Sequence, residues 1–169
     1  GCVGSNASKC HHTPSLRLLG HNRELLLDLG ILVDDYHSDM TRTVFFGRPS
    51  RELKKIHRIV LEANQRAISA VRAGKKCSRI DAAGRKVIEK AGYGRYFGHG
   101  LGHSLGLEIH EWPSFSANDK TRLESGMIMT IEPGIYLPGV GGVRIEDMVL
   151  VRPDGCEVLT ESPRTIVVS

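Results

Sequence analysis

The spacing of apolar residues predicts two amphipathic helices in the middle of the chain. Apolar positions recur with helical period between Ser50, a favoured N-cap residue, and Gly74. The same period returns between Ser78, a second cap, and Gly92, a typical helix terminator. The sequence therefore predicts two consecutive helices, each with one apolar side.

Apolar, β-branched and aromatic runs predict strands on both sides of these helices. The expected strands are Leu25–Val33 and Thr41–Phe46, paired as a hairpin before the helices, and Met127–Glu132, Val143–Val151 and Glu157–Thr160 after them. The last two are joined at Asp154 and Gly155, a dipeptide typical of hairpin turns. This order of elements predicts the α+β class.

Composition narrows the kind of protein without naming its chemistry. A chain of 169 residues with 40% hydrophobic positions can form one domain with a substantial core. No run approaches the roughly 20 apolar residues that span a bilayer, and dispersed basic residues with 5% aromatics disfavour nucleic-acid binding. Four widely spaced cysteines predict reduced thiols rather than disulfides. We therefore expect a cytoplasmic protein without a membrane or nucleic-acid partner.

Acidic residues in the first hairpin predict a carboxylate pair. If Val33 and Asp34 form a two-residue turn, Asp28 and Asp39 are cross-strand partners with Cβ atoms about 5 Å apart. A bulge would change this register.

The second set of strands repeats the arrangement. A three-residue loop at 138–140 makes Glu132 and Glu146 cross-strand partners. Opposed like charges destabilise a sheet unless a cation neutralises them. Two such pairs favour a divalent metal site.

A glycine-rich stretch supplies histidines. His99, His103 and His110 alternate with glycines, which disfavour a helix and favour an extended segment with close backbone approach. In a strand His99 and His103 point the same way, and His110 joins them if the chain bends near Gly106. Isolated His57 is interpreted as a structural residue.

Five motifs together resemble the pita-bread metallopeptidases, specifically Xaa-Pro aminopeptidases and Xaa-Pro dipeptidases. The matching segments, in the family's order, are Leu27–Gly30, Ser38–Thr43, His99–Pro113, Thr130–Gly134 and Gly142–Asp147. The resemblance implies a curved antiparallel sheet with flanking helices, in a catalytic domain over residues 1–169 that is partial at its N-terminus.

The resemblance also implies a dinuclear metal centre. Its ligands would be Asp28, Asp39, His103, Glu132 and Glu146. Four carboxylates offset two divalent ions, and oxygen ligands with one imidazole suit manganese first, with cobalt, iron or zinc as alternatives.

Further residues match the family's catalytic positions. Glu132 would carry a proton from water to the leaving nitrogen, while His99 and His110 would bind the substrate and the tetrahedral intermediate. His11 matches a histidine on the substrate side, and Arg144 would orient the carboxylates.

The substrate implied is a peptide with proline at its second position. Methionine aminopeptidases share the stretch from His103 to Pro113, whereas the segments His99–Gly102, Glu132–Tyr136 and Val143–Asp147 are of the proline-peptidase type. An Xaa-Pro dipeptidase, a methionine aminopeptidase-like enzyme and a non-catalytic peptide-binding module of the same fold are the alternatives.

The helix count predicts an uncovered sheet face. A helix pair precedes the second set of strands, but about two dozen residues precede Leu25, where the family has a comparable pair. We expect an apolar patch beneath the first hairpin, which implies either a fragment or a protomer that forms a homodimer.

Overall fold

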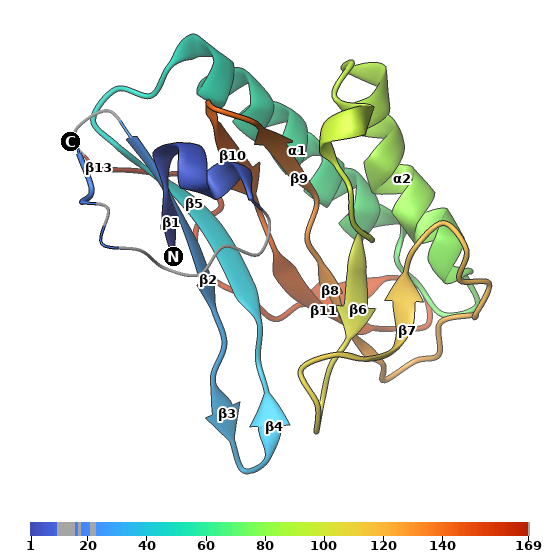
Figure 1. Cartoon of the computed structure of the whole chain (residues 1–169). Coiled ribbons are helices and arrows are strands. Elements are labelled where there is room, and N and C mark those ends of the chain that lie inside the picture. Colours follow the sequence, from blue (N-terminus) through green and yellow to red (C-terminus); the bar gives the residue numbers. More distant parts are fainter. Residues whose placement is uncertain (10–15, 17, 21–22, 169) are drawn as a thin grey trace.

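Helices α1 and α2 lie side by side against the strands (Figure 1). The computed structural model describes residues 1–9, 16, 18–20 and 23–168. The helices are α1 (Arg51–Ala70) and α2 (Cys77–Lys90), with short 3-10 turns η1 (Gly4–Ser8) and η2 (Gly94–Tyr96). The strands are β1 (Cys2–Val3), β2 (Arg23–Leu29), β3 (Leu32–Val33), β4 (Tyr36–His37), β5 (Met40–Phe46), β6 (Gly102–Ser104), β7 (Glu111–Phe115), β8 (Ile128–Ile131), β9 (Gly134–Leu137), β10 (Gly141–Arg144), β11 (Asp147–Val151), β12 (Cys156–Val158) and β13 (Ile166–Val168).

Both predicted helices are present, with shifted ends. Ser50 caps α1 by accepting the Leu53 N–H at 3.2 Å, as predicted. The helix ends at Ala70 rather than near Gly74, because Val71 takes an extended conformation and enters the core. The buried stripe that anchors α1 comprises Leu53, Ile56, Val60, Ala63 and Ala67.

Helix α2 begins at Cys77, one residue before the predicted cap. The N–H groups of Cys77 and Ser78 donate to the carbonyls of Thr121 and Asp119, so a neighbouring segment replaces the side-chain cap. At the other end Gly92 has φ +85°, which is the left-handed conformation that the terminator prediction requires.

The strands form two larger sheets with two short hairpins. Their orders are β1-β2-β5-β13 and β12-β11-β8-β6-β7, with β9 paired to β10 and β3 to β4. Within the described residues every pairing is antiparallel except that of β13 with β5, so the predicted antiparallel sheet has one parallel edge.

The predicted register of the first hairpin is wrong by one position in each strand. Its turn is formed by Asp34 and Asp35, whose φ angles are 49° and 66°, and Asp28 consequently pairs with Thr41 instead of Asp39. These angles are those of a type I′ turn, which needs positive φ at both central positions, and aspartate tolerates this whereas β-branched Val33 does not.

The register of the second hairpin is confirmed. Gly141 pairs with Leu137 across the predicted loop, and Asp147 pairs with Ile131 on the same register. The predicted strand Val143–Val151 is interrupted, however, between β10 and β11. Glu146 therefore lies at this break, across from Glu132 at the matching break between β8 and β9.

The main core lies between the helices and the sheets. It comprises aliphatic and aromatic side chains from α1, α2, β8 and β11, among them Ile56, Ile80, Met129 and Val149. Cys2, Cys77 and Cys156 are free thiols, in agreement with the predicted reduced state of these three. No helix in the described part of the chain is long and apolar enough to cross a membrane.

Candidate metal centre

Polar contacts join the first hairpin to the second set of strands. The Glu146 N–H donates to the Thr41 carbonyl at 3.0 Å, and the Thr41 hydroxyl donates to Glu146 Oε2 at 2.7 Å. Thr43 Oγ1 further donates to the Arg144 carbonyl at 3.0 Å. These bonds bring the end of the first hairpin, with Asp39, beside Glu146.

Close backbone approach brings the histidine segment to the same place. A Cβ atom on Gly102 would lie 2.0 Å from the Thr130 carbonyl oxygen, so β6 can approach β8 only with glycine at this position. The Glu132 N–H donates to the Leu101 carbonyl at 2.7 Å. The predicted role of the glycines is confirmed, and His103 comes beside Glu132.

The predicted site residues line one cleft of about 320 Å³. Its lining includes Asp28, Asp39, His99, His103, His110, Glu132, Arg144 and Glu146. One donor atom each of Asp39, His103 and Glu146 lies within 4.8 Å of the others. His103 Nε2 is also 3.5 Å from Glu132 Oε1. Four of the predicted ligands thus converge from separate strands and loops.

The hydrogen bonds of His103 orient its ring for ligation. Nδ1 lies 3.0 Å from the Ser104 carbonyl oxygen, which can only accept, so Nδ1 carries the proton. The lone pair of Nε2 therefore faces the carboxylates of Asp39 and Glu132, at 3.8 and 3.5 Å. Metal-binding imidazoles are commonly held by such a bond from the other ring nitrogen.

The carboxylates in the cleft repel each other in a poorly solvated place. Burial and the negative charge of Asp39 raise the pKa of Glu132 to about 8, although the positive charge of Arg144 lowers it in part. Burial and the charges of Glu132 and Asp39 raise the pKa of Glu146 as well. Arg144 therefore offsets the burial and mutual repulsion of these carboxylates only in part.

The donor set fits a divalent metal. Glu146 Oε1 is buried and has no hydrogen-bond partner among the described residues, although buried carboxylate oxygens normally have one. Carboxylates with one imidazole are suitable ligands for manganese, cobalt, iron or zinc. A cation at this point would satisfy the orphaned oxygen and relieve the repulsion.

Asp28 lies at the edge of the cleft. Its side chain is 48% exposed and forms an ion pair with Arg144. Arg144 Nε donates to Thr41 Oγ1 at 3.1 Å and lies 4.0 Å from Glu132 Oε2. Arg144 therefore contacts carboxylates from both hairpins, which is the position that its predicted orienting role requires.

Tyr136 is a site residue that the sequence reasoning missed. Its hydroxyl accepts from Arg144 at 3.1 Å and lies 2.8 Å from His99 Nε2. His99 Nδ1 lies 2.7 Å from the Gly100 carbonyl and so carries the proton, which leaves Nε2 to accept from the tyrosine. Tyr136 ended the Glu132–Tyr136 motif, but only the fold reveals that it connects His99 to Arg144.

His110 reaches the cleft by the predicted bend. The chain reverses between β6 and β7, and the His110 and His103 rings pack edge to face with centroids 4.5 Å apart. His110 is not among the three residues whose donor atoms converge. The remaining predicted site residue, His11, lies outside the described residues.

We expect the metal-free protein to lose stability as pH rises. The pKa of Glu132, about 8 in the fold because of burial, exceeds its value in the unfolded chain, so the folded protein holds a proton that the unfolded chain releases. This contribution is complete below about pH 4 and is lost as pH rises through about 8.

Thermal unfolding in a chelator at several pH values would measure this loss. Glu132→Gln should flatten the dependence, since the amide does not titrate, and added manganese should stabilise the wild-type protein most at alkaline pH. An equal pH slope in the variant would contradict the assignment to Glu132.

Comparisons with known proteins agree with this geometry. The chain is 51% identical over 157 residues to an uncharacterised peptidase of Staphylococcus aureus, covering 93% of this chain and 45% of that protein. It superposes on an X-Pro aminopeptidase of Thermotoga maritima with TM-score 0.96 and 40% identity, covering 99% of this chain and 48% of that chain. It also superposes on an Xaa-Pro dipeptidase of Bacillus anthracis with TM-score 0.97 and 43% identity. This match covers 99% of this chain and 47% of that chain.

These superpositions confirm the predicted pita-bread fold. The chain spans about half the length of the relatives that it matches. A family model, Metallopeptidase family M24, matches residues 1–153. The chain therefore belongs to metallopeptidase family M24.

Proposed function

We propose that this protein hydrolyses the peptide bond between an N-terminal residue and proline. The observation that carries the proposal is the convergence of Asp39, His103 and Glu146 within 4.8 Å, beside Glu132, in a cleft that also holds His99 and His110. A purely structural set of carboxylates would be paired with cations, whereas Glu146 keeps an unpartnered oxygen among the described residues.

The proposed metal centre holds two divalent ions, manganese before cobalt, iron or zinc. Its ligands are Asp28, Asp39, His103, Glu132 and Glu146, whose four carboxylates match the charge of two such ions. When bound, the ions supply Lewis acidity to the attacking water and to the scissile carbonyl.

Glu132 moves the proton in this scheme. Its carboxylate accepts a proton from the attacking water and donates it to the leaving nitrogen of proline. With 18% of its side chain exposed, Glu132 is largely shielded from solvent between accepting this proton and donating it. Arg144, at 4.0 Å, holds the carboxylate in place without competing for the proton, because arginine stays charged.

His99 and His110 orient the substrate from the cleft wall. Their rings line the same cleft as His103, but neither belongs to the three residues whose donor atoms converge. An imidazole N–H of His110 can donate to the substrate carbonyl and to the oxyanion that develops from it. Both ring nitrogens of His99 are engaged, Nδ1 by the Gly100 carbonyl and Nε2 by the Tyr136 hydroxyl, so the ring has a fixed orientation in the cleft wall.

The proline preference rests on the segments of proline-peptidase type and on solved relatives described as an X-Pro aminopeptidase and an Xaa-Pro dipeptidase. To test it, the manganese-loaded protein would be given Ala-Pro, Ala-Pro-Ala-Ala and Met-Ala-Ser in parallel. Cleavage of the longer proline peptide supports the aminopeptidase proposal.

Other results select the alternatives. Cleavage restricted to Ala-Pro indicates a dipeptidase, and preferred cleavage after methionine indicates a methionine aminopeptidase-like enzyme. Tight binding of the peptides without turnover, at full metal loading, indicates a peptide-binding module and rejects the catalytic proposal.

We expect His103→Ala to lose manganese affinity by at least about tenfold more than His110→Ala. The reason is geometric, since His103 Nε2 faces the carboxylates of Asp39 and Glu132, whereas the His110 ring packs edge to face against the His103 ring. Isothermal titration with manganese measures both variants, and circular dichroism checks their folding. Equal losses of affinity would contradict the division between ligand and substrate-binding histidine.

A further inference from the structure

His99 lies in a segment without regular secondary structure. Residues 97–101 connect η2 to β6 and belong to neither a helix nor a strand. A glycine precedes His99 and another follows it, and glycine leaves the backbone freer to rotate than any other residue does. The ring bonds of His99 to Gly100 and Tyr136 orient the imidazole, but they do not hold the backbone that carries it. Another element must fix this backbone.

Arg85 of α2 contacts the segment through its guanidinium group. Nη2 donates to the His99 carbonyl at 2.7 Å, and Nη1 donates to the Phe97 carbonyl at 3.2 Å. The guanidinium also lies over the Phe97 ring, with Cζ 4.3 Å from the ring centroid. The Phe97 and His99 rings pack edge to face with centroids 4.9 Å apart. Arg85 thus holds the backbone of His99 directly and its ring through Phe97.

Asp81 fixes the direction of this guanidinium. Its two carboxylate oxygens accept from Nε and Nη2 of Arg85, each at 2.8 Å. Such a bidentate pair sets the plane of the guanidinium as well as its position. Asp81 is buried, with 1% exposed, and burying an ion pair is costly. A pair that only supported the helix could lie on its exposed side, whereas this one lies where it orients the His99 segment.

We propose that Arg85 is a positioning residue for His99 and holds it in the place that substrate binding requires. The inference rests on the proposed function, in which His99 orients the substrate. Arg85 is not among the described residues that line the cleft, so it acts through His99 rather than on the substrate. It makes four hydrogen bonds, to Asp81, Phe97 and His99. Lysine, whose donors all lie on one nitrogen, cannot reproduce them.

Arg85→Lys tests this role, because it keeps a positive charge beside Asp81 and loses the separate contacts to the two carbonyls. We expect kcat/KM for a proline peptide at saturating manganese to fall by about tenfold. Manganese affinity should equal that of the wild type, since His99 is not among the three converging donors. Arg79→Lys changes an exposed arginine of the same helix, and this control should keep full activity.

A double-mutant cycle separates positioning from a general structural role. In a His99→Ala background, Arg85→Lys should change kcat/KM by less than about twofold. Asp81→Asn, which weakens the hold on the guanidinium at nearly constant volume, should behave in the same way. It takes the place of Arg85→Lys if thermal unfolding shows that variant to be unfolded. An equal loss of kcat/KM with and without His99 would overturn the inference.

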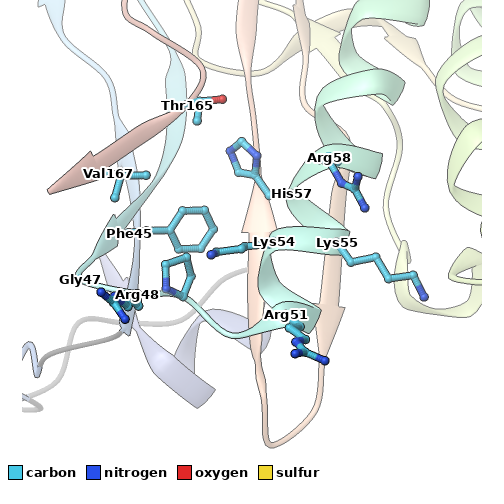
Figure 2. A pocket seen from close by; sticks show the side chains of 11 residues that line it. Phe45, Gly47, Arg48, Arg51, Lys54, Lys55, His57, Arg58, Thr165 and Val167 are labelled. Carbon is cyan, nitrogen blue, oxygen red and sulfur yellow. The ribbon is translucent and has the colours of Figure 1, made fainter. Parts of the chain in front are cut away.

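Imidazole resonances give a second readout that needs no turnover. In two-dimensional ¹H–¹⁵N spectra, the His99 signal is identified by its loss in His99→Ala, and it should shift in Arg85→Lys. His57, which lies on α1 beside Phe45 and outside the lining of the cleft (Figure 2), is the internal reference and should not shift. An unchanged His99 signal would refute the positioning role. If the wild-type protein cleaves no peptide, the proposed function fails, and these spectra alone decide whether Arg85 positions His99.

Discussion

Glu132→Gln should fold normally and lose nearly all peptidase turnover, with a decrease in kcat of about 10²–10⁴-fold. Glutamine keeps the volume of the side chain, and the Glu132 N–H to Leu101 hydrogen bond belongs to the backbone. The amide cannot accept a proton from water and return it to the leaving nitrogen. It also removes one negative charge from the proposed metal centre.

Two measurements separate these effects. Hydrolysis of a proline peptide at saturating manganese gives kcat, and metal analysis shows how much metal the variant retains. Glu124→Gln, an exposed carboxylate outside the cleft, is the control and should retain full activity. Wild-type turnover in a metal-loaded Glu132→Gln protein would exclude Glu132 as the proton carrier.

Asp39→Ala and Glu146→Ala should each lower the bound manganese from about two ions toward one or none. Both side chains contribute a donor atom to the converging group, although they come from different hairpins. Removing either leaves the remaining buried carboxylates with an incomplete set of ligands. Metal binding should therefore depend on both halves of the chain at once.

Metal analysis after dialysis, with titration of the metal-free protein, measures this dependence. Glu124→Ala serves as the matched control, because its carboxylate is exposed and lies outside the cleft. Retention of two tightly bound ions by either site variant would refute the proposed ligand set. The metal titration measures manganese binding and needs no turnover. It therefore remains valid even if the protein fails to cleave the proline peptides.

The sequence by itself determined the features that depend on neighbouring residues. Ser50 caps α1, and Gly92 ends α2, because caps and left-handed glycines act within one turn of a helix. The register between Glu132 and Glu146 followed from the length of one short loop. Local rules were sufficient wherever the decisive contacts lay within a few residues.

Tertiary structure decided the features that depend on distant segments. Helix α2 starts at Cys77 because carbonyls of Asp119 and Thr121 accept its first N–H groups, which its own sequence cannot indicate. The turn of the first hairpin is different, because Asp34 and Asp35 take its positive φ angles and Val33 cannot, which is a local preference that the predicted register overlooked.

The site itself shows the same division. The sequence identified the acidic and histidine side chains, because their types and motifs carry chemical information. It did not reveal that Thr41 donates to Glu146 or that Tyr136 joins His99 to Arg144. The bonds of Thr41 with Glu146 and of Tyr136 with His99 link residues 105 and 37 positions apart, so they exist only once the sheets have packed and brought these groups within hydrogen-bond distance.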